Sequence, residues 1–488
     1  MPTILGANSV SGYNVSNSIR FNSGDNPKLE RTLVAATGEK VFSFSTWVKR
    51  SSIGGSQSNY LLYGVDGSSN SFNWYFRNDA LRLYENTAGS GGAYITTNQD
   101  FRDTHAWYHV LLVYNTNEST NTNRVKIYIN GSQIDPSDLS VDNWPDEDYT
   151  NAEVVKNGNT MRVGASGSNS EDFDGYLAET NFIDGIAASP GDFGETNDNG
   201  VWVPKKYTAT VYGNNGFFFE YKQTGTTANS SGAGADTSGE DHHFSWNGDT
   251  HDITTDTPTN IFATMSNLYS DKQQGGAITF SEGNCKIVTS YTDAAYSRYP
   301  QAYSSIAVTK GKWYFEMKPI SGDVYNIGVF SPEDFASDST TNPYGGEAAT
   351  GAIYTEGGEV RQNNSTTGSM GTYDDGNIVG CALDMDNNAV YFHKDNTYIN
   401  SGNPTSGASK TGAFTLPTTG ENGTPITLYG FTCGDEGAAD VGTMSINFGN
   451  PPYTPSSIES DANGYGSFEF APPSGYYALC TKNLAEYG

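Results

Sequence analysis

Hydrophobic and polar residues alternate most clearly between Trp107 and Gly131, and this pattern predicts an antiparallel hairpin. Two β-patterned runs, Tyr108–Tyr114 and Arg124–Ile129, are separated by residues 115–123, which include no apolar residue. A polar segment between two such runs is typical of a loop that joins neighbouring strands. The stretch therefore predicts two paired strands with a long polar loop between them.

The two predicted strands differ in how they are buried. The second run is apolar at every other position, which is typical of a strand with one buried face. Residues Val110–Val113 of the first run are all apolar, which predicts an inner strand covered on both faces. Asn130 and Gly131 supply the two positive-φ residues of a type I′ turn.

Short runs separated by turn-forming residues continue before the hairpin and predict an all-β fold. Aromatic residues reach 13%, which indicates a folded chain, and 56 glycines supply turns, while no long amphipathic helical pattern occurs. The predicted strands are Phe42–Lys49, Tyr60–Val65, Phe72–Arg77, Leu81–Tyr84 and Ala93–Thr96.

The charge balance excludes one broad class of partner. The chain carries 26 basic and 55 acidic residues, a net charge of −29, and such a surface repels phosphate. We therefore expect no nucleic-acid binding. The acidic surface is interpreted as a solubility device, with divalent-cation sites as the alternative.

The cysteines, the N-terminal residues and the lengths of the apolar runs indicate the cellular compartment in which the chain is made. The four cysteines have no CxxC spacing, which favours buried free thiols over metal binding or disulfides. The N-terminal residues have no basic region followed by an apolar one, and no apolar run approaches the ~20 residues of a membrane span. We expect synthesis in a cytoplasm, without a Sec-type signal and without membrane insertion.

Five motifs in order resemble the laminin-G-like jelly roll of the concanavalin A type. They are FSFSTWVKR (Phe42–Arg50), WYHV, RVKIYING, MRVG (Met161–Gly164) and DFDGYLAETNFIDG (Asp172–Gly185). The resemblance implies an N-terminal strand, with Ile19 and Phe21 in the core, that pairs near the end of the domain.

The next segments are not a general feature of that family. Gly191–Tyr221 and Asp256–Leu268, which contains DTPTN, resemble segments of virion proteins of marine and other tailed phages. Between them, Gln223–Gly239 is rich in Gly, Ser and Thr, which predicts a flexible linker.

A second β domain is predicted from about residue 277. Gly311–Phe330, Gly380–Ile399 and Thr427–Gly449 resemble the SPRY-type β-sandwich, whose binding is delegated to loops at one end. Within the first segment, residues 313–318 alternate as a half-buried strand should.

The fold class is therefore all-β, with two antiparallel sandwiches joined by a Gly/Ser-rich linker. The predicted boundaries are 1–222 for the jelly roll, 223–268 for the linker with the DTPTN-like segment, 269–455 for the SPRY-like sandwich and 456–488 for a C-terminal tail. The tail is too apolar to be solvated, so we expect it to pack on the second domain or on a neighbouring subunit.

No constellation in the sequence indicates catalysis. Jelly-roll glycoside hydrolases place their carboxylates along one strand in an E-x-D-x-x-E pattern, and this spacing is absent. Glu171, Asp172 and Asp174 come nearest. His242, His243, His251 and Asp241 could ligate a metal, but a solvated polar patch is the favoured interpretation. We predict a protein that is not an enzyme and requires no cofactor.

Two kinds of binding site are predicted, one for calcium and one for sugar. The resemblance implies a rim Ca²⁺ site, which suits oxygen ligands, and the available loop acids are Asp66, Asp138, Asp142, Asp172 and Asp174. The candidate sugar platforms are Trp74, Trp144, Trp202 and Trp246. For Trp144, a packed loop anchor is the alternative.

These features together predict a non-enzymatic virion protein on the surface of a phage particle. The leading interpretation is a tail fibre or receptor-binding appendage that recognises host surface polysaccharide through multivalent sites. The alternative is a capsid-decorating or head-fibre protein, and a soluble cellular lectin is a third interpretation. We expect other virion proteins as partners and a homo-oligomer, with a trimer as the expected state.

Overall fold

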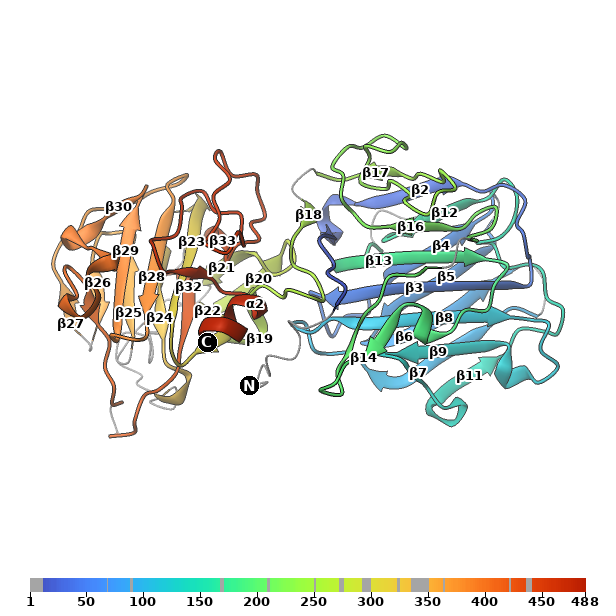
Figure 1. Cartoon of the computed structure of the whole chain (residues 1–488), viewed down its shortest axis with the longest axis horizontal. Coiled ribbons are helices and arrows are strands. Elements are labelled where there is room, and N and C mark those ends of the chain that lie inside the picture. The colour runs from blue at the N-terminus through green and yellow to red at the C-terminus, as the bar shows by residue number, and fades with distance from the viewer. Residues whose placement is uncertain are drawn as a thin grey trace. The chain divides into compact units, whose positions relative to one another are not determined.

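The structure is a computed structural model that describes most of the chain in two compact units. The described residues are 12–67, 69–87, 91–166, 171–208, 211–249, 252–271, 276–291, 300–322, 325–334, 351–362, 365–420, 423–435 and 441–488. The first unit ends at Asn260 and the second runs from Ile261 to Gly488 (Figure 1). Each unit contains two sheets that are built almost wholly from antiparallel strand pairs, which confirms the predicted all-β class.

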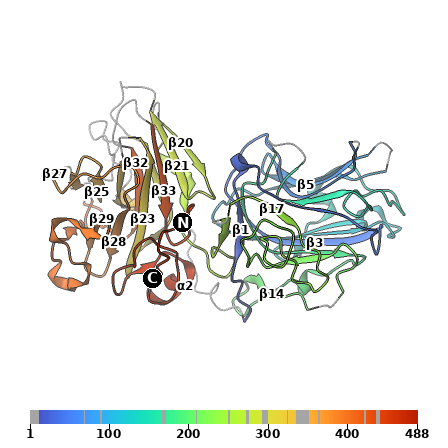
Figure 2. The same cartoon turned by 90° about the horizontal axis from the view of Figure 1, so that it is seen from above.

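The first unit is a sandwich of two sheets, here called sheet A and sheet B (Figure 2, in which β3 and β5 mark the two layers). Sheet A has the order β10-β9-β8-β3-β13-β1-β18, with β16 joined to β13. Its strands are β1 (Ser18–Phe21), β3 (Val41–Arg50), β8 (Tyr108–Asn115), β9 (Val125–Ile129), β10 (Ser132–Gln133), β13 (Gly175–Asp184), β16 (Phe217–Phe219) and β18 (Ile253–Thr254).

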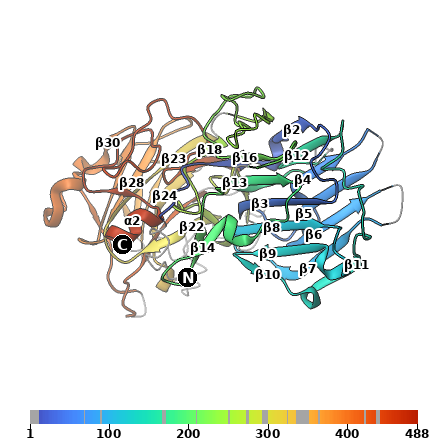
Figure 3. The ribbon, with the colours of Figure 1, turned by 45° about the vertical axis from the view of Figure 1, so that its right-hand side comes forward.

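Sheet B has the order β11-β7-β6-β5-β4-β12-β2-β17, and most of its strands are labelled in Figure 3. These are β2 (Lys28–Thr32), β4 (Asn59–Val65), β5 (Ser71–Arg77), β6 (Ala80–Asn86), β7 (Tyr94–Asp100), β11 (Leu139–Asn143), β12 (Thr160–Val163) and β17 (Ser245–Asn247). A separate hairpin pairs β14 (Gly194–Thr196) with β15 (Trp202–Pro204). Short 3-10 helices occur at η2 (Ser23–Asp25), η3 (Asn121–Asn123), η4 (Pro136–Asp138) and η5 (Pro190–Asp192).

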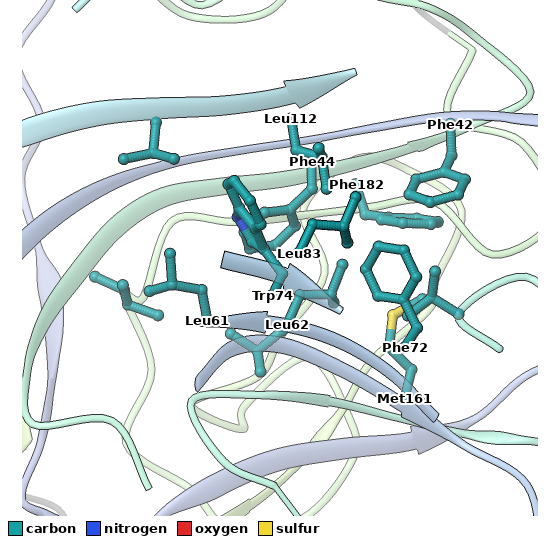
Figure 4. Close-up of a cluster of buried hydrophobic side chains, with 14 of the residues drawn as sticks. Phe42, Phe44, Leu61, Leu62, Phe72, Trp74, Leu83, Leu112, Met161 and Phe182 are labelled. Atoms are coloured by element: carbon teal, nitrogen blue, oxygen red, sulfur yellow. The ribbon is translucent and has the colours of Figure 1, made fainter. Parts of the chain in front are cut away.

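The core of the first unit lies between the two sheets (Figure 4). Phe42 and Phe44 from β3 face Phe72 and Trp74 from β5, and all four side chains are fully buried. Burial of aromatic side chains of this size is the main source of stability for such a sandwich.

The predicted hairpin is confirmed. Strands β8 and β9 pair antiparallel, with Val110 opposite Ile129 and Tyr114 opposite Val125. Asn130 and Gly131 both have positive φ, as the tight turn into β10 requires.

Sheet A is covered on both of its faces. One face packs on sheet B, and Leu111 and Val113 of β8 point to the other face. The described residues between β13 and β16 cover that second face through Ala188, Phe193, Tyr207 and Tyr212, and Phe218 of β16 points to the same face. This double cover explains why residues 110–113 are all apolar.

The segment predicted to be a linker is part of the first unit instead. Phe244 and Trp246 are buried in the main core, and β17 extends sheet B by pairing with β2. Ala233 also lies in that core. Residues 223–239 form tight turns on the sandwich, and the division into units falls after Asn260, near the end of the predicted 223–268 segment.

The DTPTN motif at the end of the first unit binds to β3 and to the segment that leads into β1. Asp256 forms a buried ion pair with Lys49 of β3, with 2.7 Å between Oδ2 and Nζ, and its Oδ1 accepts a hydrogen bond from Trp107 Nε1 at 3.2 Å. Thr257 and Asn260 form a tight turn through reciprocal backbone hydrogen bonds. Thr259 then exchanges hydrogen bonds with the backbone of Val15, which holds the chain that leads into β1.

The second unit also consists of two sheets, here called sheet C and sheet D. Sheet C has the order β19-β22-β32-β24-β25-β26-β27. Its strands are β19 (Met265–Asp271), β22 (Gln301–Val308), β24 (Tyr325–Phe330), β25 (Ala352–Thr355), β26 (Val360–Gln362), β27 (Ser365–Thr367) and β32 (Tyr429–Asp435).

Sheet D has the order β20-β21-β33-β23-β28-β29-β30, with β31 joined to β29 and β34 to β23. Its strands are β20 (Gly276–Ser281), β21 (Lys286–Tyr291), β23 (Lys312–Ser321), β28 (Val379–Asp384), β29 (Ala389–Lys394), β30 (Thr397–Tyr398), β31 (Phe414–Thr415), β33 (Val441–Asn447) and β34 (Tyr477–Ala478). The helices are η7 (Pro332–Asp334), η8 (Ile399–Ser401), η9 (Pro404–Ser409) and α2 (Thr481–Tyr487).

The C-terminal tail packs on its own unit, as one of the two sequence-based alternatives predicted. Phe468 and Tyr476 are buried with Tyr314 of β23, on the face of sheet D that points away from sheet C. The Glu316 carboxylate accepts hydrogen bonds from the backbone N–H groups of Glu469 and Phe470, both at 2.9 Å. Strand β23 is therefore buried on both faces, and the prediction of a half-buried strand was wrong because the tail covers its second face.

Two further findings concern the compartment predictions. All four cysteines are buried and free, which confirms the favoured interpretation. Among the described residues, no helix has the length and apolar character needed to cross a membrane.

We expect Asp256→Ala to destabilise the first unit strongly. The substitution leaves the Lys49 ammonium buried without its partner, which costs about 3–5 kcal/mol of unfolding free energy. Calorimetric unfolding of the purified chain measures the effect. The matched control is Asp148→Ala, which removes the exposed Lys40–Asp148 pair and costs less than about 1 kcal/mol. Equal losses of unfolding free energy in the two variants would show that the buried Lys49–Asp256 pair does not stabilise the first unit.

A second prediction concerns pH. Burial raises the pKa of Glu85 to about 7, while hydrogen bonds from Ala93 N–H and the Tyr114 hydroxyl lower it. The folded unit therefore retains a proton that the unfolded chain releases near pH 4.5. The stabilising contribution of this proton, about 3 kcal/mol, is fully present below pH 4.5 and is lost as the pH rises through 7.

Glu85→Gln removes this titration without a large change of shape. We expect the difference in unfolding free energy between wild type and variant to change with pH between about 4.5 and 7 and to be constant above that range. Urea denaturation at a series of pH values measures this difference. A difference that does not change with pH would show that Glu85 keeps its ordinary pKa.

Candidate functional site

The outer face of sheet B carries tyrosine, arginine and asparagine side chains at the positions where the inner face carries large apolar ones. Along β5, Phe72, Trp74 and Phe76 point into the core, so Asn73 and Tyr75 point outward. Strands β6 and β12 alternate in the same way, and β4 has a register shift between Tyr60 and Leu62, with Tyr60 and Tyr63 paired to the outward residues of β5. This surface is here called the tyrosine face.

The strand register arranges the tyrosine face in two rows. In the first row, neighbouring strands place in line Tyr94, Tyr84, Asn73, Tyr63, Arg162 and Glu30. In the second row they place in line Thr96, Arg82, Tyr75 and Tyr60. At ~4.8 Å between neighbouring strands, the tyrosines of the first row span about 14 Å.

Contacts between rings fix the tyrosines in place. Tyr60 stacks on Tyr75 with ring centroids 4.9 Å apart and meets Tyr63 edge to face at 5.5 Å. Tyr84 and Tyr94 form a second edge-to-face pair at 5.1 Å. Tyr84 is 36% exposed and Tyr94 is half-buried, whereas Tyr60 and Tyr75 are buried, at 7% and 6% exposure. The tyrosine face is therefore a preorganised aromatic surface.

Charged groups are distributed unevenly over the tyrosine face. Arg162 lies over the Tyr63 ring at 6.0 Å from its centroid, and its Nε is 3.0 Å from Glu30 Oε2. Burial raises the pKa of Tyr75, and the positive charges of Arg82 and Arg77 oppose this rise. Arginine nitrogens and tyrosine hydroxyls together provide many hydrogen-bonding groups on an otherwise aromatic surface.

The four tryptophans predicted as sugar platforms lie elsewhere and do not form a common surface. Trp74 and Trp246 are buried in the core, at 0% and 3% exposure, so their prediction as exposed platforms was wrong. Trp144 is half-buried and packs against the core, as the alternative of a loop anchor predicted. Each of these rings contributes to the packing of the sandwich.

Trp202 also has a structural contact. Its Nε1 donates a hydrogen bond to Nδ1 of the buried His109 at 3.2 Å, and its ring packs directly on Gly131. Gly131 has φ of +82°, and a Cβ at this position would lie 2.5 Å from the Trp202 ring. Burial lowers the pKa of His109 to about 3, so the imidazole is neutral and accepts the indole hydrogen bond.

A separate pocket lies at the rim of the first sandwich. It is a pocket of about 350 Å³ that is lined by Ser23, Gly24, Arg50, Ser52, Ile53, Gly55, Gln57, Asn59, Asp172 and Asp174. Burial raises the pKa of Asp172 to about 6. The backbone N–H of Asp174 donates to Asn59 Oδ1 at 3.3 Å, which ties the loop before β13 to the start of β4.

The structure brings together only two of the five acids predicted to bind calcium. Asp172 and Asp174 both line the rim pocket. Asp66 accepts backbone hydrogen bonds within the turn between β4 and β5, and Asp138 and Asp142 are exposed at η4 and β11. Among the described residues, no group of three or more His, Cys, Asp or Glu side chains is arranged to hold a metal ion.

The histidine patch has structural contacts where it is described. His243 Nδ1 accepts the backbone N–H of Asp236 at 2.9 Å, and His242 Nδ1 lies 2.7 Å from the Gly216 carbonyl. His251 lies outside the described residues. These contacts tie the Gly- and Ser-rich segment to the sandwich.

The tyrosine face was missed at the sequence level, although its signal is present. The runs SFNWYFR and ALRLYEN both alternate strictly, with large apolar residues at every second position. Reading the intervening positions as one surface would have selected Tyr75, Arg77, Arg82 and Tyr84.

Comparisons with known proteins agree with the fold of the first unit. Residues 21–190, about a third of the chain, match the model of the concanavalin A-like lectin/glucanases superfamily. A search of curated proteins found no match. The first sandwich therefore has the predicted laminin-G and concanavalin A-like fold.

Solved structures give distant similarities. The SPRY domain of human HERC1 has a TM-score of 0.26 at 12% identity, covering 37% of this chain and 96% of that one. The heptameric SAP-like pentraxin of Limulus polyphemus has a TM-score of 0.27 at 18% identity, covering 37% and 81%. A protein of Bacteroides ovatus, titled as a candidate carbohydrate binding protein, has a TM-score of 0.33 at 13% identity, covering 50% and 60%.

We expect calcium to leave the melting temperature of the first unit unchanged. Arg50 lines the same pocket as Asp172 and Asp174, and its positive charge opposes a bound cation. Thermal unfolding in calcium and in EDTA measures this. A rise in melting temperature with calcium that Asp174→Asn abolishes would instead identify a metal site in the pocket.

Proposed function

We propose that this chain is a non-enzymatic carbohydrate-binding protein whose first unit binds glycan on the tyrosine face of sheet B. The observation that carries the proposal is the edge-to-face pair of Tyr84 and Tyr94 on neighbouring strands, in which Tyr84 is 36% exposed and the half-buried Arg82 lies on the same face. The match to a superfamily of lectins and glucanases supports the choice of a carbohydrate ligand.

Sugars have the chemistry that this face fits. A pyranose ring presents apolar C–H groups on its faces and hydroxyl groups around its edge. Tyrosine rings exclude water from the C–H groups, while side-chain nitrogens and phenolic hydroxyls exchange hydrogen bonds with the hydroxyls. A row of about 14 Å favours an extended oligosaccharide over a single sugar.

The proposal assigns no catalysis to this chain. Retaining glycosidases need two carboxyl groups about 5 Å apart, and inverting enzymes need a wider pair with room for water. The chain lacks the E-x-D-x-x-E spacing that would place such a pair on one strand. On the tyrosine face, Glu30 is engaged by Arg162.

We further propose that the protein is a surface component of a tailed-phage virion, made in the host cytoplasm. This proposal rests on the resemblance of Gly191–Tyr221 and Asp256–Leu268 to segments of phage virion proteins. A tail fibre or receptor-binding appendage would engage host polysaccharide through weak sites, made effective by repetition in a homo-oligomer such as a trimer attached to other virion proteins.

The alternative, a capsid-decorating or head-fibre protein, receives less support from the contacts of the tail. A terminal anchor needs apolar side chains free to bind the shell. The described tail instead buries Phe468, Tyr476 and Leu479 in its own unit. We therefore favour the appendage.

The double substitution Tyr84→Ala/Tyr94→Ala tests the glycan site. We expect the dissociation constant for any glycan bound by the wild type to rise at least about tenfold, because both solvent-facing rings are lost. A glycan array first identifies a ligand, and isothermal titration calorimetry then gives the dissociation constants.

The matched control is Tyr487→Ala, which removes one ring of the stacked Tyr477–Tyr487 pair in the second unit. It should leave glycan affinity unchanged. Unfolding curves establish that the first unit is intact in the double variant. Wild-type affinity in a folded double variant, or equal loss in both variants, would place the glycan site elsewhere.

A further inference from the structure

Two arginines of the tyrosine face have no acidic partner. Arg77 ends β5, and Arg82 lies on β6 directly opposite Tyr75. In the part of the chain that the structure describes, neither forms an ion pair. Six other described arginines do pair with carboxylates, namely Arg20, Arg50, Arg102, Arg124, Arg162 and Arg361.

This lack of partners is notable in so acidic a chain. With 55 acidic residues against 26 basic ones, an exposed arginine has many carboxylates available to it. A pair of guanidinium groups left without acids on one face therefore provides local positive charge there. Their charge is free to interact with a ligand.

The two arginines lie close to the Tyr84–Tyr94 pair. Arg82 lies opposite Tyr75 across the β5–β6 pair, and Arg77 follows Tyr75 two positions later on β5, so both lie on the same part of the tyrosine face. Arg82 is half-buried, and its Nε is shielded from solvent without a hydrogen-bond partner. Tyr84 follows Arg82 two positions later on β6, so both side chains point outward, about 7 Å apart along the strand.

Acids flank the tyrosine face at both of its edges, and the exposed Asp142 lies on β11, the strand that pairs with β7. Glu30 on β2 pairs with Arg162. Burial raises the pKa of Tyr60 and Tyr63 on β4, and the negative charge of Glu171 raises it further. Asp66 also acts on Tyr63. Asp100, at the end of β7, lies 3.8 Å from Arg102. The middle of the tyrosine face, over β5 and β6, thus combines the two arginines with the exposed Tyr84 ring, and the acids lie on either side of it.

We propose that the tyrosine face selects acidic glycans, with Arg77 and Arg82 holding a carboxylate or sulfate group while Tyr84 and Tyr94 pack against the sugar rings. This inference rests on the proposed glycan-binding function and names its substrate class. A guanidinium group donates two parallel hydrogen bonds to a planar carboxylate and similarly fits a sulfate. Partial burial of Arg82 strengthens such a contact relative to a fully exposed one.

The net charge of −29 repels a polyanion at long range, so it cannot account for such a preference. Selection of an acidic glycan must come from the two arginines at the site itself. Their removal should therefore abolish the preference and leave the attraction for sugar rings in place.

The experiment compares three polymers on the full chain by affinity electrophoresis and calorimetry. Dextran sulfate and dextran share one backbone and differ in charge, while alginate carries carboxylates in place of sulfates. We expect the wild type to bind at least one anionic polymer about tenfold more tightly than dextran. Arg77→Gln/Arg82→Gln should lose that tenfold preference and retain the affinity for dextran.

The control is Lys126→Gln/Lys205→Gln, which removes two positive charges from the same unit away from sheet B. It should keep the preference, and unfolding curves verify that both double variants are folded. Stronger binding of alginate or of dextran sulfate identifies the acidic group as a carboxylate or a sulfate.

The outcomes separate this inference from the function on which it rests. Equal binding of all three polymers, a preference that survives Arg77→Gln/Arg82→Gln, or no binding of either anionic polymer overturns the inference. If one of these results is found but Tyr84→Ala/Tyr94→Ala still abolishes dextran binding, the proposed glycan-binding function stands and only the preference for acidic glycans is wrong. If the Tyr84→Ala/Tyr94→Ala variant binds the polymers as tightly as the wild type, the proposed glycan site is wrong as well.

Discussion

The burial of sheet A between two layers is the constraint on which the rest of the first unit depends. Sheet B covers one of its faces, and residues 186–218 cover the other through Phe193, Tyr207 and Tyr212. A sheet that is enclosed in this way cannot present a binding surface. Sheet B, which packs on one side only, is left to carry the polar and aromatic face, and the alternation of its strands follows from that difference.

Much of this fold could be predicted from the sequence because the signals are local. Alternation identified β9, an all-apolar run identified β8 as an inner strand, and Asn130-Gly131 identified the turn. Such features depend only on neighbouring residues and on the two-residue period of a strand. The order of the five motifs then predicted the two-sheet sandwich of the first unit.

The errors arose where distant segments meet. Residues 223–239 have the composition of a linker, yet Ala233 within them and Phe244 and Trp246 just after them are buried in the core of the first unit. Strand β23 has a half-polar pattern, but the tail buries its second face and Glu316 caps two backbone N–H groups there. The prediction of Trp74 as an exposed sugar platform was wrong for a related reason. Its exposure depends on which face of β5 packs on the other sheet, and residues distant in sequence decide this.

The contacts of the DTPTN motif have a consequence for how this unit can be used. Strand β1 pairs with β18, and Val15 bonds to Thr259, so the polypeptide enters and leaves the sandwich at the same edge of sheet A. A domain whose ends meet can be inserted into a loop of another protein, or given new termini, with little disturbance. Because that edge belongs to sheet A, such grafting would leave the tyrosine face of sheet B unobstructed, and the unit is suited to act as a transferable recognition module.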